Sequence, residues 1–230
     1  MMWCLVMLIL AGVSWADNSV NNSEYSILMC PKLNSQEEID LDKIMGKWYV
    51  VEVLEHKGDP QKPVSGSYIV DSCPIVKLRA LEYSSLRLLW TEEAGNLEYT
   101  FRIPDISRKP GVWVSSSQQN GTLATSRDRK YNQFTGTVNV MKAVASDMVL
   151  TFCSGRPDNQ LYSLLLAREH ILQKSDKRGV HNLLGRRGLK IVSIRETCMN
   201  NAGQTGGSFQ LIGWLTFMGV LSTGLLSGRW

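Results

Sequence analysis

From Trp48 onward one pattern recurs along the chain: short runs of alternating apolar and polar residues, separated by clusters of Gly, Pro, Asn, Asp or Ser. Alternation with a period of two is typical of β-strands that bury one face. No long helical pattern separates the runs, which favours antiparallel strands over βαβ units. The runs predict strands at Lys47 to Leu54, Val76 to Tyr83, Leu86 to Glu92, Leu97 to Ile103, Val112 to Ser117, Phe134 to Val144, Met148 to Cys153 and Leu161 to Arg168.

The connections between these runs are mostly short and rich in turn-forming residues, as before Leu97, Val112 and Leu161. Eight antiparallel strands with short connections can close into a ring, which removes the exposed edges of an open sheet. The interior of such a ring is just large enough for side chains or one small ligand. We therefore predict an all-β fold, an eight-stranded antiparallel up-and-down β-barrel. The longest connection, Glu55 to Ser72, is predicted to be a mobile flap at one mouth.

After the eighth run the pattern changes. His170 to Arg187 is predicted to form a helix, which Gly179 and Gly185 weaken. Alternation returns from Leu189 to Arg195, which predicts a short final strand that ends close to Cys198.

Both ends of the chain resemble processing signals. Met1 to Ala16 is an apolar run that ends in small residues at Ser14 and Ala16, the order of a secretory signal peptide, although no Lys or Arg precedes the run. A buried N-terminal helix is the alternative, which the lack of a polar face disfavours. Residues 17–199 are then expected to form one barrel domain.

The C-terminal tail, residues 200–230, contains 18 uncharged residues from Phe209 to Leu226. As a helix they would span about 27 Å, against a bilayer core of about 30 Å. The tail is either a short membrane span followed by Arg229 or a GPI-attachment signal that is removed. Small residues from Asn200 to Gly203, a polar spacer and an apolar end match the order of the GPI signal, which we favour. The expected location is extracellular, secreted or attached to the outer face of the plasma membrane.

Loss of the signal peptide removes Cys4 and leaves four cysteines, which predicts two disulfides in an exported chain with three pairings open. Sequons at Asn21 and Asn120 predict N-glycosylation. The formal charge of +4 is too small to imply a nucleic-acid partner. We interpret the basic residues between Lys174 and Arg195 as a solvated helix face, with contact to acidic lipid headgroups as the alternative.

A family resemblance begins at Gly46-Lys47-Trp48-Tyr49. This Gly-x-Trp-Tyr motif follows a short 3₁₀-like approach from Leu41 to Met45, and it resembles the opening of the first strand in the lipocalins. Within that family the chain is most similar to the group of apolipoprotein D, Lazarillo and the insect bilin-binding proteins. Arg168 ends the eighth run, where the family places an arginine. The resemblance spans Cys30 to Cys198, but the family's usual Thr-Asp-Tyr is absent from Lys142 to Asp147.

The resemblance implies structural roles at one end of the barrel for Gly46, Trp48 and Arg168. The Trp48 indole would plug the closed end, and the Arg168 guanidinium would stack on its face. The resemblance also implies the disulfide pairing, which is Cys30 with Cys153 and Cys73 with Cys198.

One alternating face of the strands supplies the candidate ligand-binding residues, because ligand pockets are concave and mostly apolar. A slip of one residue would exchange the two faces, and plain core packing is the alternative for each candidate. The candidates are Val50, Glu52, Trp90, Tyr99, Phe101, Trp113, Phe134, Met141, Met148 and Phe152.

These features predict extracellular binding, with transport or sequestration, of a small hydrophobic ligand such as a fatty acid, sterol, retinoid-like molecule or tetrapyrrole. The alternative is a membrane-anchored recognition protein whose barrel loops contact a cell-surface protein. An enzyme is disfavoured, because the sequence has three histidines and neither His-Glu-x-x-His nor Gly-x-Ser-x-Gly. We expect no metal site and no cofactor other than a bound lipophilic ligand or pigment.

Overall fold

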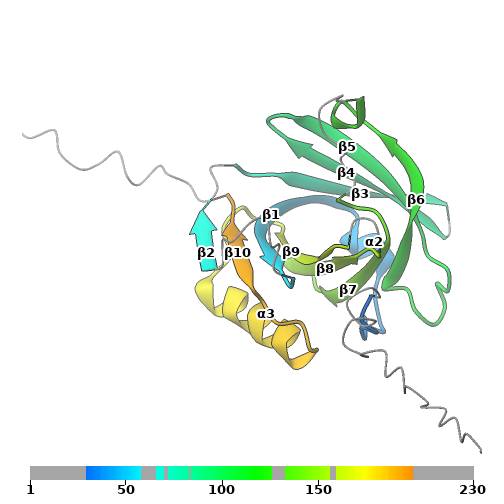
Figure 1. Ribbon diagram of the computed structural model, residues 1–230. Coiled ribbons are helices and arrows are strands. Elements are labelled where there is room, and N and C mark those ends of the chain that lie inside the picture. The colour runs from blue at the N-terminus through cyan, green and yellow to red at the C-terminus, as the bar shows by residue number, and fades with distance from the viewer. Residues whose placement is uncertain are drawn as a thin grey trace, which may run out of the picture. The chain divides into compact units, whose positions relative to one another are not determined.

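A computed structural model of the chain describes residues 30–57, 66–69, 72–82, 84–125, 133–155 and 159–198 (Figure 1). The chain divides into two compact units, Met1–Met199 and Asn200–Trp230, and every described residue belongs to the first. The predicted signal peptide, the sequon at Asn21 and the predicted GPI signal lie outside the described residues. No helix among the residues described is long and apolar enough to cross a membrane.

Eight antiparallel strands form a closed ring, because β1 pairs with β3 on one side and with β9 on the other (Figure 1). The predicted all-β, eight-stranded up-and-down barrel is confirmed, and the fold is that of the lipocalins. The ring contains β1 (Gly46–Glu55), β3 (Ile75–Glu82), β4 (Ser85–Glu92), β5 (Gly95–Arg102), β6 (Val112–Asn120), β7 (Thr137–Ala143), β8 (Asp147–Cys153) and β9 (Leu161–Ala167).

Strand β1 closes the ring because its two edges pair with different strands. Gly46 to Tyr49 pair with β3, whereas Tyr49 to Glu55 pair with β9. A bulge between Val50 and Glu52 interrupts the second ladder. A β-bulge bends a strand and increases its twist, which suits a strand that must serve two neighbours at different angles.

Two elements differ from the sequence-based expectations. β2 (Gly66–Ile69) is a strand inside the segment predicted to be a mobile flap, and it pairs in parallel with β10 (Ser193–Glu196). No strand was predicted at these residues, because a four-residue strand with a distant partner has too little local pattern to detect. α2 (Leu41–Ile44) is a turn of α-helix rather than 3₁₀, and the Asp40 side chain accepts a hydrogen bond from the Lys43 amide as its N-cap.

The predicted helix is present as α3 (Lys174–Arg186), and a single 3₁₀ turn, η1 (Leu123–Thr125), follows β6. α3 lies along the outside of the barrel (Figure 1) and buries Val180 and Leu184. A Cβ added at Gly179 or at Gly185 would have no neighbouring atom within 4 Å. The missing side chains therefore leave no gap in the packing of α3.

Apolar residues form two separate cores. One fills the barrel interior with residues from all eight ring strands. The other lies between the barrel wall and α3, where Val51 and Leu54 of β1 meet Val180 and Leu184. The strand wall is therefore buried on both faces beneath the helix.

Both disulfides have the pairing that the family resemblance implied, which is confirmed. Cys30 is joined to Cys153 across 123 residues, and Cys73 to Cys198 across 125 residues. In the chain-entropy model each such loop contributes about 4 to 5 kcal/mol. The bridges fasten the segment before β1 and the segment after β10 to the barrel.

Candidate functional site

The closed end of the barrel is sealed by Trp48 and Arg168. Trp48 is fully buried, and its indole N–H donates to the carbonyl of Ile44 at 2.8 Å. The Arg168 guanidinium lies 3.6 Å from the centroid of the Trp48 ring, within the range of a cation–π contact. It also donates to three backbone carbonyls, those of Lys43, Met45 and Lys47, at 2.7 to 2.9 Å.

Gly46 makes this arrangement possible. Its φ is +97°, a backbone conformation that residues with a Cβ rarely adopt. A Cβ at this position would also lie 3.4 Å from Nη1 of Arg168. The glycine, the tryptophan and the arginine of the predicted barrel end therefore lie together in one seal.

Most of the predicted ligand-binding residues face the barrel interior. Since up-and-down strands place alternate connections at opposite ends, the open end lies opposite α2 and carries the connections after β1, β4, β6 and β8. The predicted residues in the interior core are Val50, Trp90, Tyr99, Phe101, Trp113, Phe134, Met148 and Phe152.

Glu52 and Met141 do not line the interior, which corrects the sequence-based expectation for both. Met141 belongs to the outer core beneath α3, and the Glu52 carboxylate contacts α3. A β-bulge lies between Val50 and Glu52 and shifts the alternation by one residue, so a strict period of two from Val50 assigns Glu52 to the wrong face. Met141 directly follows the inward-facing Val140, so a period of two in its own strand already places it on the outer face.

Several residues of the interior are absent from the set predicted from the sequence. Tyr162 packs against the core, and Leu88 and Leu97 are fully buried in it. Each lies two residues from another residue of the same core, so continuing the alternation along each strand would have found them.

Aromatic rings form a connected chain through the interior. Phe134 is its centre, with ring centroids 5.4 Å from Trp90, 5.5 Å from Tyr99 and 5.3 Å from Phe152. The chain continues from Tyr99 through Phe101 to Trp113 and from Phe152 to Tyr162, with centroids 5.1 to 6.3 Å apart. These spacings are those of rings in contact, so a molecule in the interior would meet aromatic faces and edges.

Few polar atoms belong to this interior. The indole N–H of Trp113 donates to the carbonyl of Pro110 at 2.8 Å. The Tyr162 hydroxyl donates to the carbonyl of Gln133, and burial raises the pKa of Tyr162 well above its ordinary value, so the phenol stays neutral. Trp90 Nε1 is buried and has no hydrogen-bond acceptor among the residues that the structure describes.

The two carboxylates that are buried among the described residues do not face this interior: Glu52 contacts Lys177 of α3, and Asp147 pairs with Ala167 of the outer core. Two charged side chains that share the inward-facing side of the strands lie at the rim of the barrel. Arg195 pairs with the inward-facing Val53, and Glu55 pairs with the inward-facing Tyr162, so both lie on the inner face near the open end. The barrel thus has an uncharged interior below a rim of mixed charge.

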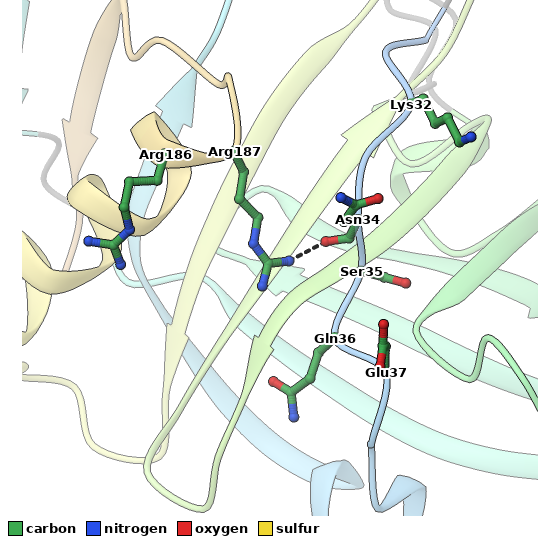
Figure 2. Close-up of a pocket in the computed structure, with 7 residues that line it drawn as sticks. All are labelled: Lys32, Asn34, Ser35, Gln36, Glu37, Arg186 and Arg187. Atoms are coloured by element: carbon green, nitrogen blue, oxygen red, sulfur yellow. Dashed lines mark hydrogen bonds between the residues drawn. The ribbon is translucent and has the colours of Figure 1, made fainter.

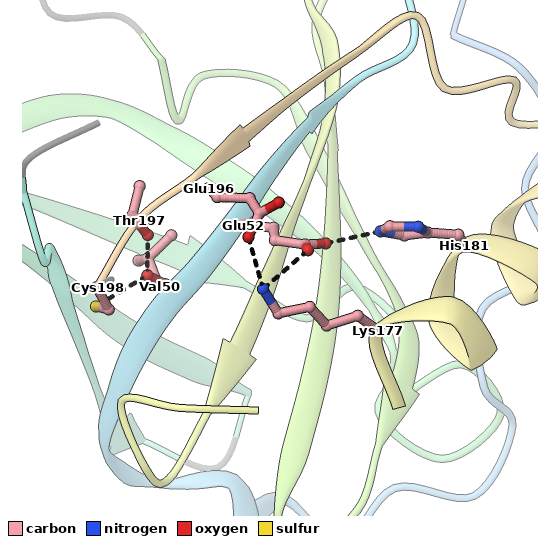
Figure 3. A network of polar contacts seen from close by, with 7 residues as sticks. All are labelled: Val50, Glu52, Lys177, His181, Glu196, Thr197 and Cys198. Atoms are coloured by element: carbon pink, nitrogen blue, oxygen red, sulfur yellow. Dashed lines mark hydrogen bonds and ion pairs between the residues drawn. The ribbon is translucent and has the colours of Figure 1, made fainter. Parts of the chain in front are cut away.

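Outside the barrel, Glu52 joins a polar network that fastens α3 to β1 and β10 (Figure 3). The Lys177 ammonium lies 3.3 Å from the Glu52 carboxylate and 3.0 Å from that of Glu196. His181 Nε2 donates to the other Glu52 oxygen at 2.7 Å. Glu52 is only 1% exposed, so these partners supply the compensation that a buried carboxylate needs.

A second buried polar chain involves His56, Ser163 and Thr151. His56 Nδ1 lies 3.2 Å from the Lys190 carbonyl, and Nε2 lies 2.7 Å from the Ser163 hydroxyl. Because a carbonyl only accepts, Nδ1 carries the proton and Nε2 of the neutral ring accepts from Ser163. A serine beside an oriented histidine resembles a nucleophile with its base, but Ser163 is fully buried, and substrate has no access to it.

Two surface hollows lie outside the barrel interior. The first, of about 480 Å³, is formed by the segment before α2 and by Arg186 and Arg187 at the end of α3 (Figure 2). Arg187 donates to the Asn34 carbonyl across it. The second, of about 800 Å³, lies beside α2 and includes Ile106 and Pro110.

No protein-family model matches the chain, and no curated protein matches it. Solved structures, in contrast, are similar to the chain. The amine-binding protein of Rhodnius prolixus in its tryptamine complex is 14% identical, with 70% of this chain and 82% of that chain covered and a TM-score of 0.50. The siderocalin Ex-FABP, described as functioning through dual ligand specificities, is 16% identical, with 70% and 97% covered and a TM-score of 0.47. The Rhodnius structure shares the fold of this chain.

Proposed function

We propose that this lipocalin-fold protein binds a small hydrophobic molecule inside its barrel, for transport or sequestration. The observation that carries the proposal is the connected set of aromatic rings in an uncharged interior that is sealed at one end by Trp48 and Arg168. Removing apolar surface of a ligand from water there would contribute about 25 cal/mol per Å². The Rhodnius neighbour, solved with tryptamine, supports a small-molecule role for this fold.

Entry of a ligand would take place at the open end. Because the rings around Phe134 touch one another, a ligand must part them to reach the interior. We therefore expect binding to change the packing of these rings and the fluorescence of Trp90 and Trp113. Candidate ligands are fatty acids, sterols, retinoid-like molecules and tetrapyrroles.

A fluorescence titration with a panel of these four classes tests the proposal. We expect saturable quenching by at least one class, and we expect Phe134→Leu to weaken it by reshaping the centre of the ring chain. Met141→Leu, on the outer face of the same wall, is the matched control and should leave the affinity unchanged. Absence of saturable quenching across the whole panel would refute the proposal.

We also propose that the protein binds without catalysing a reaction. The one serine–histidine pair described above is buried in the wall of the barrel, and its hydrogen bonds join β1, β8 and β9 to the segment at Lys190. Ser163→Ala should therefore change the stability of the fold while leaving ligand affinity unchanged. Turnover of a bound panel ligand, followed by mass spectrometry, would contradict the proposal.

The proposed place of action is outside the cell. Two disulfides support it, because such bonds persist in oxidising compartments. Asn120 is exposed at the end of β6, where an N-glycan would extend into solvent. The motifs at Gly46 to Tyr49 and the cysteine order support placement near apolipoprotein D and Lazarillo. Recovery of a glycosylated protein from the cell exterior is the expected result, and an unglycosylated cytosolic protein would contradict it.

A membrane-anchored recognition protein is the second candidate. The apolar C-terminal tail supports it, and so does the polar hollow beside Arg186 and Arg187, which offers charged groups on the outer surface. We expect release of the protein from cells by phosphatidylinositol-specific phospholipase C if the tail is a GPI signal. Retention on the membrane after this treatment would favour a spanning segment, and recovery in the medium without treatment would contradict anchoring.

A further inference from the structure

Trp90 differs from the other two tryptophans of the interior core. Trp48 and Trp113 each donate an indole hydrogen bond to a backbone carbonyl at 2.8 Å. Trp90 is 7% exposed, yet its Nε1 has no acceptor in the part of the chain that the structure describes. An unpaired buried donor is unfavourable, because it has given up its hydrogen bonds to water without gaining another, so such a group calls for a reason.

The position of Trp90 suggests a reason. The residue lies on β4, paired with Val76 and Leu97, two residues before the strand ends at the open side of the barrel. Its ring is 5.4 Å from that of Phe134, the centre of the aromatic chain. A molecule that enters from the open end and packs against Phe134 would therefore lie against the Trp90 indole, which carries the unpaired N–H.

The surroundings restrict the chemistry of such a molecule. The buried carboxylates of the described residues, Glu52 and Asp147, lie on the outer face of the wall, so a charged group placed deep in the interior would lose its hydration without either of them as a partner. The charged groups oriented inward, Glu55 and Arg195, belong to the rim on β1 and β10. The acceptor at Trp90 is therefore a neutral oxygen or nitrogen, and the aromatic wall favours a flat ring beside it.

We infer that Trp90 selects the ligand by donating its indole hydrogen bond to a neutral acceptor, such as a carbonyl oxygen, on a flat, uncharged ring compound. This inference rests on the proposed function, since it assigns a ligand class to the same interior. It makes Trp90 a specificity-determining residue, distinct from Trp48 and Trp113, whose N–H groups are already used by the fold.

A matched pair of probes tests the inference. Fluorenone and fluorene are flat tricyclic compounds that differ by a carbonyl in place of a methylene group. A typical hydrogen bond predicts that fluorenone binds about 3- to 10-fold more tightly than fluorene. In Trp90→Phe, which keeps a ring and removes the N–H, we expect the two affinities to become equal. Trp113→Phe is the control and should preserve the ratio, because the Trp113 N–H faces Pro110.

A measurement on the unmodified protein complements the variants. The ¹⁵N-indole resonance of Trp90 should move downfield in proton shift on fluorenone binding and much less on fluorene binding, whereas those of Trp48 and Trp113 should not distinguish the probes. Equal affinities in the wild type, or an unchanged ratio in Trp90→Phe, would overturn the inference and leave the proposed function standing. If panel lipids bind but neither fluorenone nor fluorene does, the assignment of a flat ring compound as the ligand is overturned. Failure of every compound to bind would refute the proposed function itself.

Discussion

At the closed end, one guanidinium covers an indole and holds three carbonyls that belong to α2 and the start of β1. Arg168 therefore joins the end of β9 to the beginning of the barrel. A lysine in its place would keep the charge, but it would lose the planar stacking surface and most of the donors.

Arg168→Lys is expected to lower the free energy of unfolding by about 2 kcal/mol, since hydrogen bonds from a charged donor contribute about 1.5 to 3 kcal/mol. Chemical denaturation would measure the loss. Arg79→Lys, at an exposed position of β3, is the control and should change stability by less than about 0.5 kcal/mol. Equal effects of the two substitutions would contradict the role assigned to Arg168.

His56 is expected to make the stability of the fold depend on pH. Burial lowers the pKa of its imidazole below the ordinary value of 6.5. The folded protein thus binds this proton more weakly than the unfolded chain does. As the pH falls below about 6.5 the unfolded chain takes up more protons, so the free energy of unfolding decreases until the folded-state pKa is passed.

Comparison with His56→Gln isolates this contribution. Urea unfolding between pH 7.5 and pH 5 should show a larger loss of stability in the wild type than in the variant. The variant cannot take up the proton, and the other titrating groups are common to both proteins. Parallel pH profiles would contradict the assignment.

Residue-scale prediction from sequence worked where alternation was uninterrupted. Trp90, Tyr99 and Phe101 could be assigned to one face because no bulge precedes them within their strands. Glu52 could not, since a bulge inserts a residue without leaving a mark in a short apolar run. The outward position of Met141 could have been predicted, because it directly follows the inward-facing Val140. The unpaired N–H of Trp90 was also beyond reach, because hydrogen-bond satisfaction depends on neighbours that only the fold supplies.

At the scale of elements, α3 is held to the barrel by apolar contact and by the carboxylate of Glu52. Lys177 and His181 both reach this group from one face of the helix, four residues apart. The helix interior contains two glycines, so its intrinsic propensity is poor and its docking contacts matter more.

Glu52→Gln is expected to destabilise the protein by about 2 to 3 kcal/mol, because it leaves the ammonium of Lys177 with Glu196 as its only remaining carboxylate among the described contacts. The substitution should accelerate hydrogen exchange more at the amides of α3 than at the amides of β8. Glu93→Gln, in the exposed turn after β4, should leave exchange unchanged. A uniform change over all elements would argue against a local docking role.

Element prediction was accurate for the ring strands and incomplete at the edge. The alternation in each ring strand reflects burial on one face, which is a local property. β2 and β10 are four residues each and stabilise one another in parallel, with more than a hundred residues between them. Such a pairing depends on the barrel and on the Cys73–Cys198 bridge, which bring the two segments together.

For the whole molecule, the two disulfides close loops of nearly equal length. The chain-entropy model therefore predicts similar losses, about 4 to 5 kcal/mol each, for the pair Cys30→Ser with Cys153→Ser and the pair Cys73→Ser with Cys198→Ser. Denaturation of both double variants measures this. Losses that differ by more than about 2 kcal/mol would show that local packing outweighs loop entropy.

The closed ring itself could be predicted because eight alternating strands with short turns leave few other solutions that bury one face and avoid exposed edges. The packing of side chains inside the ring could not be predicted from the sequence. The contacts around Phe134 come from β4, β5, β8 and the segment before β7, and their geometry depends on the shear of the whole barrel.

The proposed ligand binds on the inner face of this barrel wall. Methyl NMR of the protein during titration with its best panel ligand can locate the bound molecule, because neighbouring residues report opposite faces. We expect saturable shifts at Val53, Leu97 and Leu164, which face inward, and none at Leu54, Val149 and Leu165, which face α3. Shifts confined to the outer set would contradict the claim.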